Sequence, residues 1–171
     1  MDERRKTQHR QQTDALYLEI GKFIVEFEEI IRAMRHAIGV ALATAGLLNP
    51  QIKGILLANL TARPLMDIMR SLIPEMTKMS PIDEKVVNEA FKRVLSLIER
   101  RNEVVHSTWL VGYGNEETVD YGEAIGIKAK LSKAGFALNT LNWRSEDFSM
   151  LSKECAEVKE MIMVMGVSMV D

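Results

Sequence analysis

The chain of 171 residues has little cysteine, few aromatic residues and no surplus of charge of one sign. Its single cysteine, Cys155, excludes an internal disulfide framework and suits a reducing compartment, so we expect a cytoplasmic protein. With 22 Lys and Arg against 24 Asp and Glu, the net charge is −2, so no overall positive field attracts nucleic acid. Any contact with a polyanion would have to come from a local cluster of cations.

Long apolar runs are also missing. Charged residues interrupt every window long enough to span a bilayer, so the sequence predicts no membrane segment. The first residues contain no apolar h-region, so we expect no secretory signal. What remains is the composition of a globular protein, with 47% hydrophobic and 27% charged residues and eleven methionines that suit an adaptable helical core.

Apolar residues recur at three- and four-residue steps along most of the chain, which is the pattern of amphipathic helices. The predicted helices cover residues 14–46, about 51–73, about 83–100, and the chain from about 145 onward. Asp14 and Asp83 are candidate N-caps, and Gly46 is a candidate stop for the first helix. Pro64 lacks a backbone donor, so the second helix should kink or break near Arg63.

Between the third and the last predicted helix the hydrophobic period changes to two. Residues 109–113 and 124–131 therefore predict two short strands, which form a hairpin at about 109–131 around an acidic turn. Residues 1–13 are almost wholly polar and predict a mobile arm. The expected fold is mainly α: one domain over 14–171, an antiparallel bundle of four to five helices with a short β-hairpin inserted before the last helix.

One stretch gathers the strongest chemical candidates. Arg101, Asn102 and His106 lie within six residues, at the end of the third predicted helix and before the first strand. Histidine exchanges a proton near neutral pH, and arginine binds phosphate with a fork of donors and stabilises developing charge. Asn102 stands four residues before His106, so it would orient the imidazole if the helix continued.

Simpler explanations of the same residues remain open. Arg101 and Asn102 suit the end of a helix, where cations and left-handed backbone are favoured. His106 and Ser107 would serve to cap backbone groups before the strand. Glu103 and His106 have the spacing of half a di-iron site, but the sequence has no second Glu-x-x-His. We therefore expect no metal and no other cofactor.

The motif Arg101-Asn102-x3-His106 resembles the signature of the HEPN superfamily, in which four to six residues separate an arginine from a histidine and Asn, Asp or His often follows the arginine. These proteins are small helical bundles. The resemblance implies a metal-independent endoribonuclease that uses the ribose 2′-hydroxyl as nucleophile and leaves a 2′,3′-cyclic phosphate, acting as a toxin or a defence effector. It covers the helices loosely and the motif specifically, and the hairpin and the N-terminal arm lie outside it.

By that resemblance His106 would be the general acid and base, Arg101 would bind the phosphate and Asn102 would hold the histidine. Arg101 and His106 are five residues apart, roughly 140° around a helix axis, so a single chain presents them on different faces. HEPN proteins commonly pair two motifs across a dimer interface, which implies a homodimer with a composite site. Further candidates for contacts with the RNA are Arg100, Ser107, Arg63 and Arg70.

Two classes of function thus follow from the sequence. The first is a ribonuclease that acts on RNA and, as a toxin, would be held by a cognate antitoxin or another protein partner. The second is a non-catalytic HEPN-like module that binds a protein or nucleotide partner and keeps the motif for structural reasons. The net charge of −2 favours the second, because a free ribonuclease gains from a positive surface.

Overall fold

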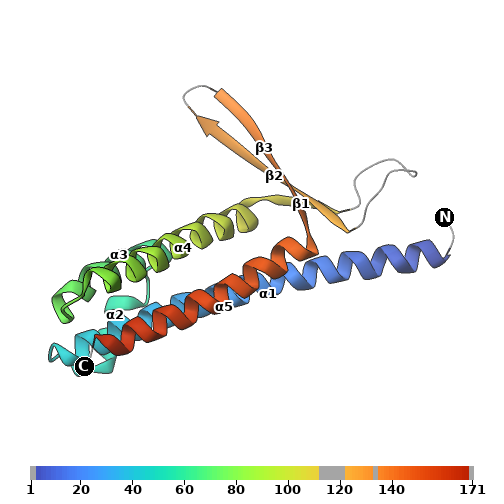
Figure 1. Ribbon diagram of the computed structural model, residues 1–171. Coiled ribbons are helices and arrows are strands. Elements are labelled where there is room, and N and C mark those ends of the chain that lie inside the picture. Colours follow the sequence, from blue (N-terminus) through green and yellow to red (C-terminus); the bar gives the residue numbers. More distant parts are fainter. Residues whose placement is uncertain (1–2, 112–121, 133–134, 170–171) are drawn as a thin grey trace. The chain divides into compact units, whose positions relative to one another are not determined.

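The computed structural model describes residues 3–111, 122–132 and 135–169. In these residues the elements are α1 (Glu3–Thr44), α2 (Pro50–Leu57), α3 (Ala62–Met76), α4 (Pro81–His106), β1 (Thr108–Val111), β2 (Glu123–Ser132), β3 (Gly135–Arg144) and α5 (Ser145–Ser168) (Figure 1). The chain is mainly α, with a small antiparallel sheet before the last helix, as the sequence predicts.

The chain divides into two compact units. The sheet unit comprises Met1–Val25 and Arg100–Lys153, and the helical unit comprises Glu26–Glu99 and Glu154–Asp171. α1, α4 and α5 contribute residues to both units. The expectation of one domain over 14–171 stays a prediction.

The sheet has the order β1-β2-β3, with β2 in the centre and both pairs antiparallel. β1 and β2 correspond to the two predicted strands, and the predicted acidic turn lies outside the described residues. β3 was not predicted. Most of its residues are exposed, so no buried face imposes an alternation of apolar and polar residues on its sequence.

An aromatic cluster forms the core of the sheet unit. The ring centroids of Trp109 and Trp143 lie 5.9 Å apart, and each lies close to Phe148 of α5, at 5.4 Å and 5.0 Å respectively. Phe148 is fully buried. Gly126 of β2 is opposite Trp109, and a Cβ atom there would lie 2.9 Å from the indole. Only glycine therefore lets the ring approach the central strand this closely.

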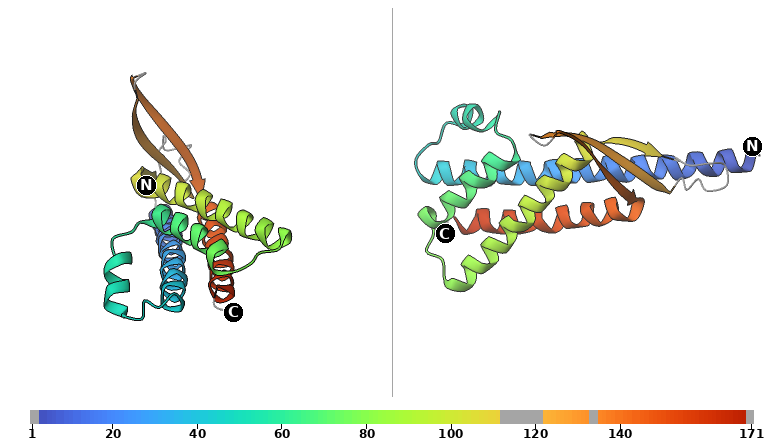
Figure 2. Two further views of the ribbon diagram at one scale, coloured as in Figure 1. Left: turned by 90° about the vertical axis from the view of Figure 1, so that its left-hand side faces the viewer. Right: turned by 90° about the horizontal axis from the view of Figure 1, so that it is seen from above.

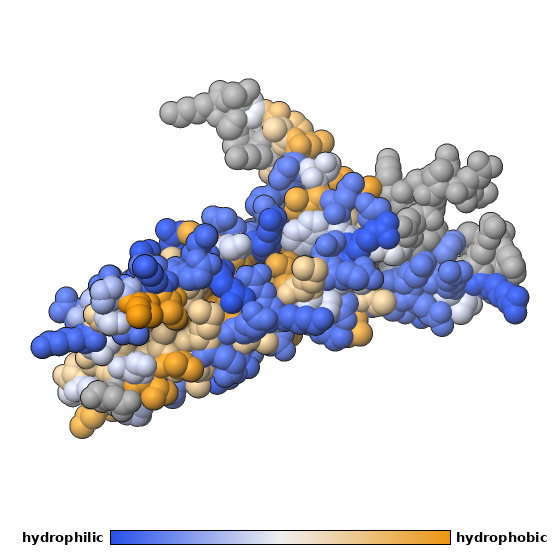
Figure 3. Space-filling model, in the orientation of Figure 1, coloured by the Kyte–Doolittle hydropathy of each residue, from blue (hydrophilic) through white to orange (hydrophobic). Residues whose placement is uncertain are grey.

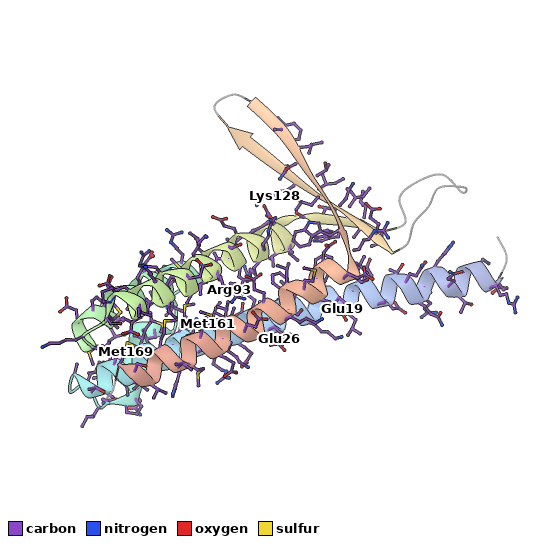
Figure 4. The ribbon with its side chains drawn as sticks, in the orientation of Figure 1. Glu19, Glu26, Arg93, Lys128, Met161 and Met169 are labelled. Atoms are coloured by element: carbon purple, nitrogen blue, oxygen red, sulfur yellow. The ribbon has the colours of Figure 1, made fainter. Side chains whose placement is uncertain are left out.

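The helical unit has an apolar core. Its buried side chains include Phe27, Ile30, Met34 and Ile38 of α1, Leu65, Met69 and Ile73 of α3, Phe91, Val94 and Leu97 of α4, and Val158 and Ile162 of α5. Beside this core, Arg93 of α4 bonds Glu157 at 2.7 Å and Glu154 at 3.3 Å, and it approaches the sulfur of Met161 (Figure 4). Because both carboxylates belong to α5, this arginine joins the two helices.

Several predicted helix ends are confirmed. α1 ends where Gly46 takes φ +98°, and the amides of Gly46 and Leu47 bond the carbonyls of Ala43 and Leu42. The second predicted helix, expected from about residue 51, begins at Pro50. Asn49 caps it by accepting from the amides of residues 51 and 52.

Pro64 also acts as predicted. It lies in the first turn of α3, where an amide has no intrahelical acceptor, and the chain breaks between Leu57 and Ala62. α5 begins at Ser145 as expected, with the Arg144 amide bonded to Asp147 at 2.7 Å.

Two predicted helix starts are wrong. α4 begins at Pro81 and its N-cap is Ser80, whose amide and hydroxyl both bond the Asp83 carboxylate, so Asp83 is the third helical residue rather than the cap. The hydrogen bonds from Ser80 lower the pKa of Asp83.

α1 begins at Glu3 rather than at Asp14, so residues 3–13 are helical. The mobile arm over 1–13 stays a prediction. Lys, Arg, Glu and Gln are good helix formers, and Lys6 pairs with Glu3 at 3.1 Å one turn earlier. These first turns are hydrophilic on the face shown in Figure 3. Among the described residues no helix is long and apolar enough to cross a bilayer.

The fit of Trp109 on Gly126 yields a prediction. Gly126→Val should lower the free energy of unfolding by ~1–3 kcal/mol, because the new side chain displaces the indole. Ala129→Val, at an exposed position of the same strand, should change it by less than ~0.5 kcal/mol. Urea denaturation followed by tryptophan fluorescence measures both values. Equal stabilities would show that the ring does not need the glycine.

Candidate functional site

The motif lies on the last two turns of α4. This helix continues to His106 and therefore includes Arg101 and Asn102. The sequence had predicted that the helix ends near residue 100. Two hydrogen bonds close the helix end: the Ser107 hydroxyl donates to the Glu103 carbonyl at 2.6 Å, and the Trp109 indole Nε1 donates to the Val104 carbonyl at 2.8 Å. These bonds satisfy carbonyl groups that a helix end leaves without intrahelical donors.

The three motif side chains do not share one face. Val104 is buried, and it fixes the rotation of the last turns. Asn102 and His106 are exposed and lie one turn apart, so they are neighbours on the helix surface. Arg101 is partly buried, with its Nε atom inaccessible to solvent. Within the described part of the chain, no hydrogen bond or ion pair is formed by the side chains of Asn102 and His106.

Arg100 is held by two neighbours. Its Nη1 atom lies 2.9 Å from the Glu103 carboxylate one turn later, and its guanidinium carbon lies 5.9 Å from the Trp143 ring centroid. Both contacts lie within the sheet unit. Arg100 is therefore an oriented cation at the edge of the motif, with its charge partly offset by Glu103. The Arg100–Glu103 spacing was visible in the sequence, whereas the contact with Trp143 depends on the unpredicted strand β3.

The remaining candidates have structural partners. Ser107 donates its hydroxyl to the helix end. Arg63 and Arg70 belong to α3 in the helical unit, where Arg63 lies 3.4 Å from Asp67 and Arg70 lies 3.1 Å from Asn88. The structure does not bring these two arginines together with Arg101, Asn102 and His106 in one unit.

These contacts decide between the simpler explanations of the motif. Arg101 and Asn102 do not end a helix, because α4 continues for another turn beyond them. Ser107 does cap the helix, as one explanation predicted, but the exposed His106 side chain takes no part in the cap. Among the residues that the structure describes, no three His, Cys, Asp or Glu side chains form a group that could hold a metal ion.

Cys155, the single cysteine of the chain, lies buried on α5 in the helical unit. Burial, with smaller contributions from Glu154 and Glu26, raises the pKa of its thiol to about 12. The reactive thiolate is therefore disfavoured in the folded chain at neutral pH.

Comparisons with known proteins give no further assignment. The chain matches no protein-family model, no curated protein and no solved structure. The resemblance to the HEPN superfamily accordingly rests on the residues of the motif and on their helical setting.

Asn102 and His106 should be dispensable for folding. His106→Ala and Asn102→Ala should each change the free energy of unfolding by less than ~0.5 kcal/mol, because both side chains are exposed and make no hydrogen bond in the described part of the chain. Trp109→Phe should cost at least ~1 kcal/mol, since it leaves the Val104 carbonyl without its indole donor. Thermal unfolding of the three variants tests this difference. A large loss in His106→Ala would mean that the histidine serves the fold.

Cys155 should resist thiol reagents. At pH 8 the native chain should react with an aromatic disulfide at least ~100-fold more slowly than the chain in denaturant, because burial and the raised pKa both oppose thiolate formation. Absorbance of the released thiol measures the two rates. Equal rates would contradict the buried setting of α5 at this residue.

Proposed function

We propose that the chain is a metal-independent endoribonuclease of HEPN type, which acts in the cytoplasm as a toxin or defence effector. One observation carries the proposal: Asn102 and His106 are exposed neighbours on the last turns of α4, while other residues close the helix end. Exposed polar side chains that the fold does not use are available for chemistry.

The proposed reaction needs a proton acceptor, a proton donor and a group that stabilises the phosphate. His106 takes the proton from the ribose 2′-hydroxyl as its oxygen attacks the adjacent phosphorus. The bond from phosphorus to the 5′-oxygen breaks, and a protonated histidine returns a proton to that oxygen. The products are a 2′,3′-cyclic phosphate and a free 5′-hydroxyl.

Arg101 supports the same step with charge. Its guanidinium donates to the phosphate oxygens and stabilises the negative charge that builds on them. Asn102 lies one helical turn from His106 and would orient the imidazole once RNA is bound. Arg100, already oriented by Glu103 and Trp143, supplies a contact to the RNA backbone.

The positions on α4 favour a homodimer. Arg101 and His106 are roughly 140° apart on one helix, so a single motif does not surround a phosphate. Two copies of the motif would place the arginine of one chain opposite the histidine of the other, and would supply one histidine as acid and one as base. A toxin of this kind would be held inactive by a cognate antitoxin or another protein partner.

The alternative is a non-catalytic HEPN-like module that binds a protein or nucleotide partner. Two observations favour it: the net charge is −2, and the Glu103 carboxylate offsets the charge of Arg100 beside the motif. RNA binding is strongest on surfaces that carry uncompensated cations.

Cleavage of mixed RNA by the purified chain in EDTA tests the proposal. The wild type should leave 2′,3′-cyclic phosphate ends, and His106→Ala and Arg101→Ala should each lower the rate at least ~100-fold. Val105→Ala, at an exposed residue beside the histidine, and Lys92→Ala, at an exposed cation of α4, should keep the wild-type rate. Liquid chromatography with mass spectrometry identifies the ends.

Two results would overturn the proposal. One is cleavage that persists in folded His106→Ala, which would point to a contaminating nuclease. The other is no cleavage by a folded, dimeric wild type, which would favour the binding module. Growth arrest on expression of the wild type, relieved by His106→Ala, is an independent readout of the same activity.

A further inference from the structure

A cavity of about 830 Å³ lies between α1 and α2 in the helical unit. Figure 2 shows α2 beside the C-terminal part of α1. Side chains of both helices line it, with Arg35, His36 and Val40 from α1 and Lys53 and Leu57 from α2. Its volume falls within the range of roughly 300–1,000 Å³ that is typical of sites for small molecules.

The polar side of this cavity is basic. Arg35, His36 and Lys53 line it, and no acidic residue among those that the structure describes does. Arg35 donates through Nη2 to the carbonyls of Leu60 at 3.0 Å and Ala58 at 3.4 Å. Lys53 donates to the Gly39 carbonyl at 3.3 Å. These acceptors are uncharged, so the guanidinium and the ammonium share the cavity without a counter-charge among its lining residues.

Donors remain for a ligand. In the part of the chain that the structure describes, the buried Nε atom of Arg35 has no hydrogen-bond partner. That atom is closed to solvent, so it does not donate to a ligand in the cavity. The hydrogen bonds that Arg35 makes to other described residues use only Nη2, which leaves the Nη1 donors for a ligand. Lys53 has two further donors, and the exposed His36 supplies a ring N–H.

The other lining residues include apolar ones, and the cavity is open to solvent. Val40, Ala43 and Leu57 supply hydrocarbon surface. Gly39 and Gly54 widen the space, since a Cβ atom added at either residue would meet nothing within 4 Å. Glycine inside a helix costs roughly 0.5–1 kcal/mol relative to alanine, and neither position is required to be glycine by packing.

We propose that this cavity binds a small phosphomonoester with an apolar body, of the size of a nucleoside monophosphate. The phosphate binds Arg35, His36 and Lys53, and the apolar body lies over Val40, Ala43 and Leu57. Three basic groups from two helices line this one cavity, and several donors suit a phosphate dianion better than a carboxylate. The site stands apart from the motif on α4 in its residues and does not depend on ribonuclease activity.

Titration calorimetry with the full chain tests the site, with adenosine monophosphate, inorganic phosphate and adenosine as probes in phosphate-free buffer. The monophosphate should bind at least ~10-fold more tightly than phosphate or adenosine, because only it reaches both sides of the cavity. Added salt should weaken its binding.

Variants locate the binding. Lys53→Gln removes one cation and Gly54→Leu fills the cavity from α2, and each should weaken monophosphate binding at least ~10-fold. Lys92→Gln, at an exposed cation outside the cavity, should bind like the wild type. Arg35 is not varied because it also donates to backbone carbonyls just after α2. Gly54→Leu should keep or raise the melting temperature, since leucine is the better helix former.

The proposal fails if the folded wild type binds neither monophosphate nor phosphate at millimolar concentration. It also fails if Lys53→Gln and Gly54→Leu bind the monophosphate as tightly as Lys92→Gln does, which would place the binding elsewhere on the chain.

Discussion

The sheet unit depends on the contacts made by the indole of Trp109. Its nitrogen closes α4 by donating to the Val104 carbonyl, and its ring lies on Gly126 of the central strand. Trp143 and Phe148 pack around it and bring in β3 and the first turns of α5. The Trp109 side chain thus sets the end of α4 and the packing of β1 on β2. It therefore also sets the position of the motif on the last turns of α4. A chain with only two tryptophans places both in this cluster.

Local signals explain most of what the sequence could predict. Gly46, Asn49, Pro50 and Pro64 act through their own backbone properties, so the breaks between α1, α2 and α3 follow from residue type alone. The start of α5 follows in the same way from acidic residues in the first turn.

Features that depend on distant residues escaped prediction. β3 is formed by pairing with β2 and has little apolar alternation of its own. The end of α4 is set by Trp109, which donates to the Val104 carbonyl. The charged residues near 100 do not end the helix, so the end predicted from them was wrong. For the site, the residue types and their order were predictable. Which of them are exposed was not, because burial of Val104 sets the rotation of the helix.

Among the residues that the structure describes, the cationic side chains have two kinds of surroundings: some pair with an acidic residue, and those of the cavity between α1 and α2 do not. Several exposed cations pair with an acidic residue within one turn, as Lys6, Lys22, Arg32 and Arg100 do. Pairs of this kind contribute little to stability but they remove local positive potential. Against that background, a pocket that gathers basic side chains without an acidic one stands out more than it would in a basic protein.

The ribbon made by β2 and β3 has a physical consequence of its own. β1 pairs with β2 only as far as residue 127, so beyond that point each long strand has a single neighbour in the described sheet. Phe136 and Leu138 are exposed there, and hydrophobic residues show on the ribbon in Figure 3. Unpaired backbone groups beside exposed apolar side chains form a template for adding another strand. Concentrated or heated protein should therefore begin to aggregate at this ribbon, and a lysine at residue 138 should delay the onset.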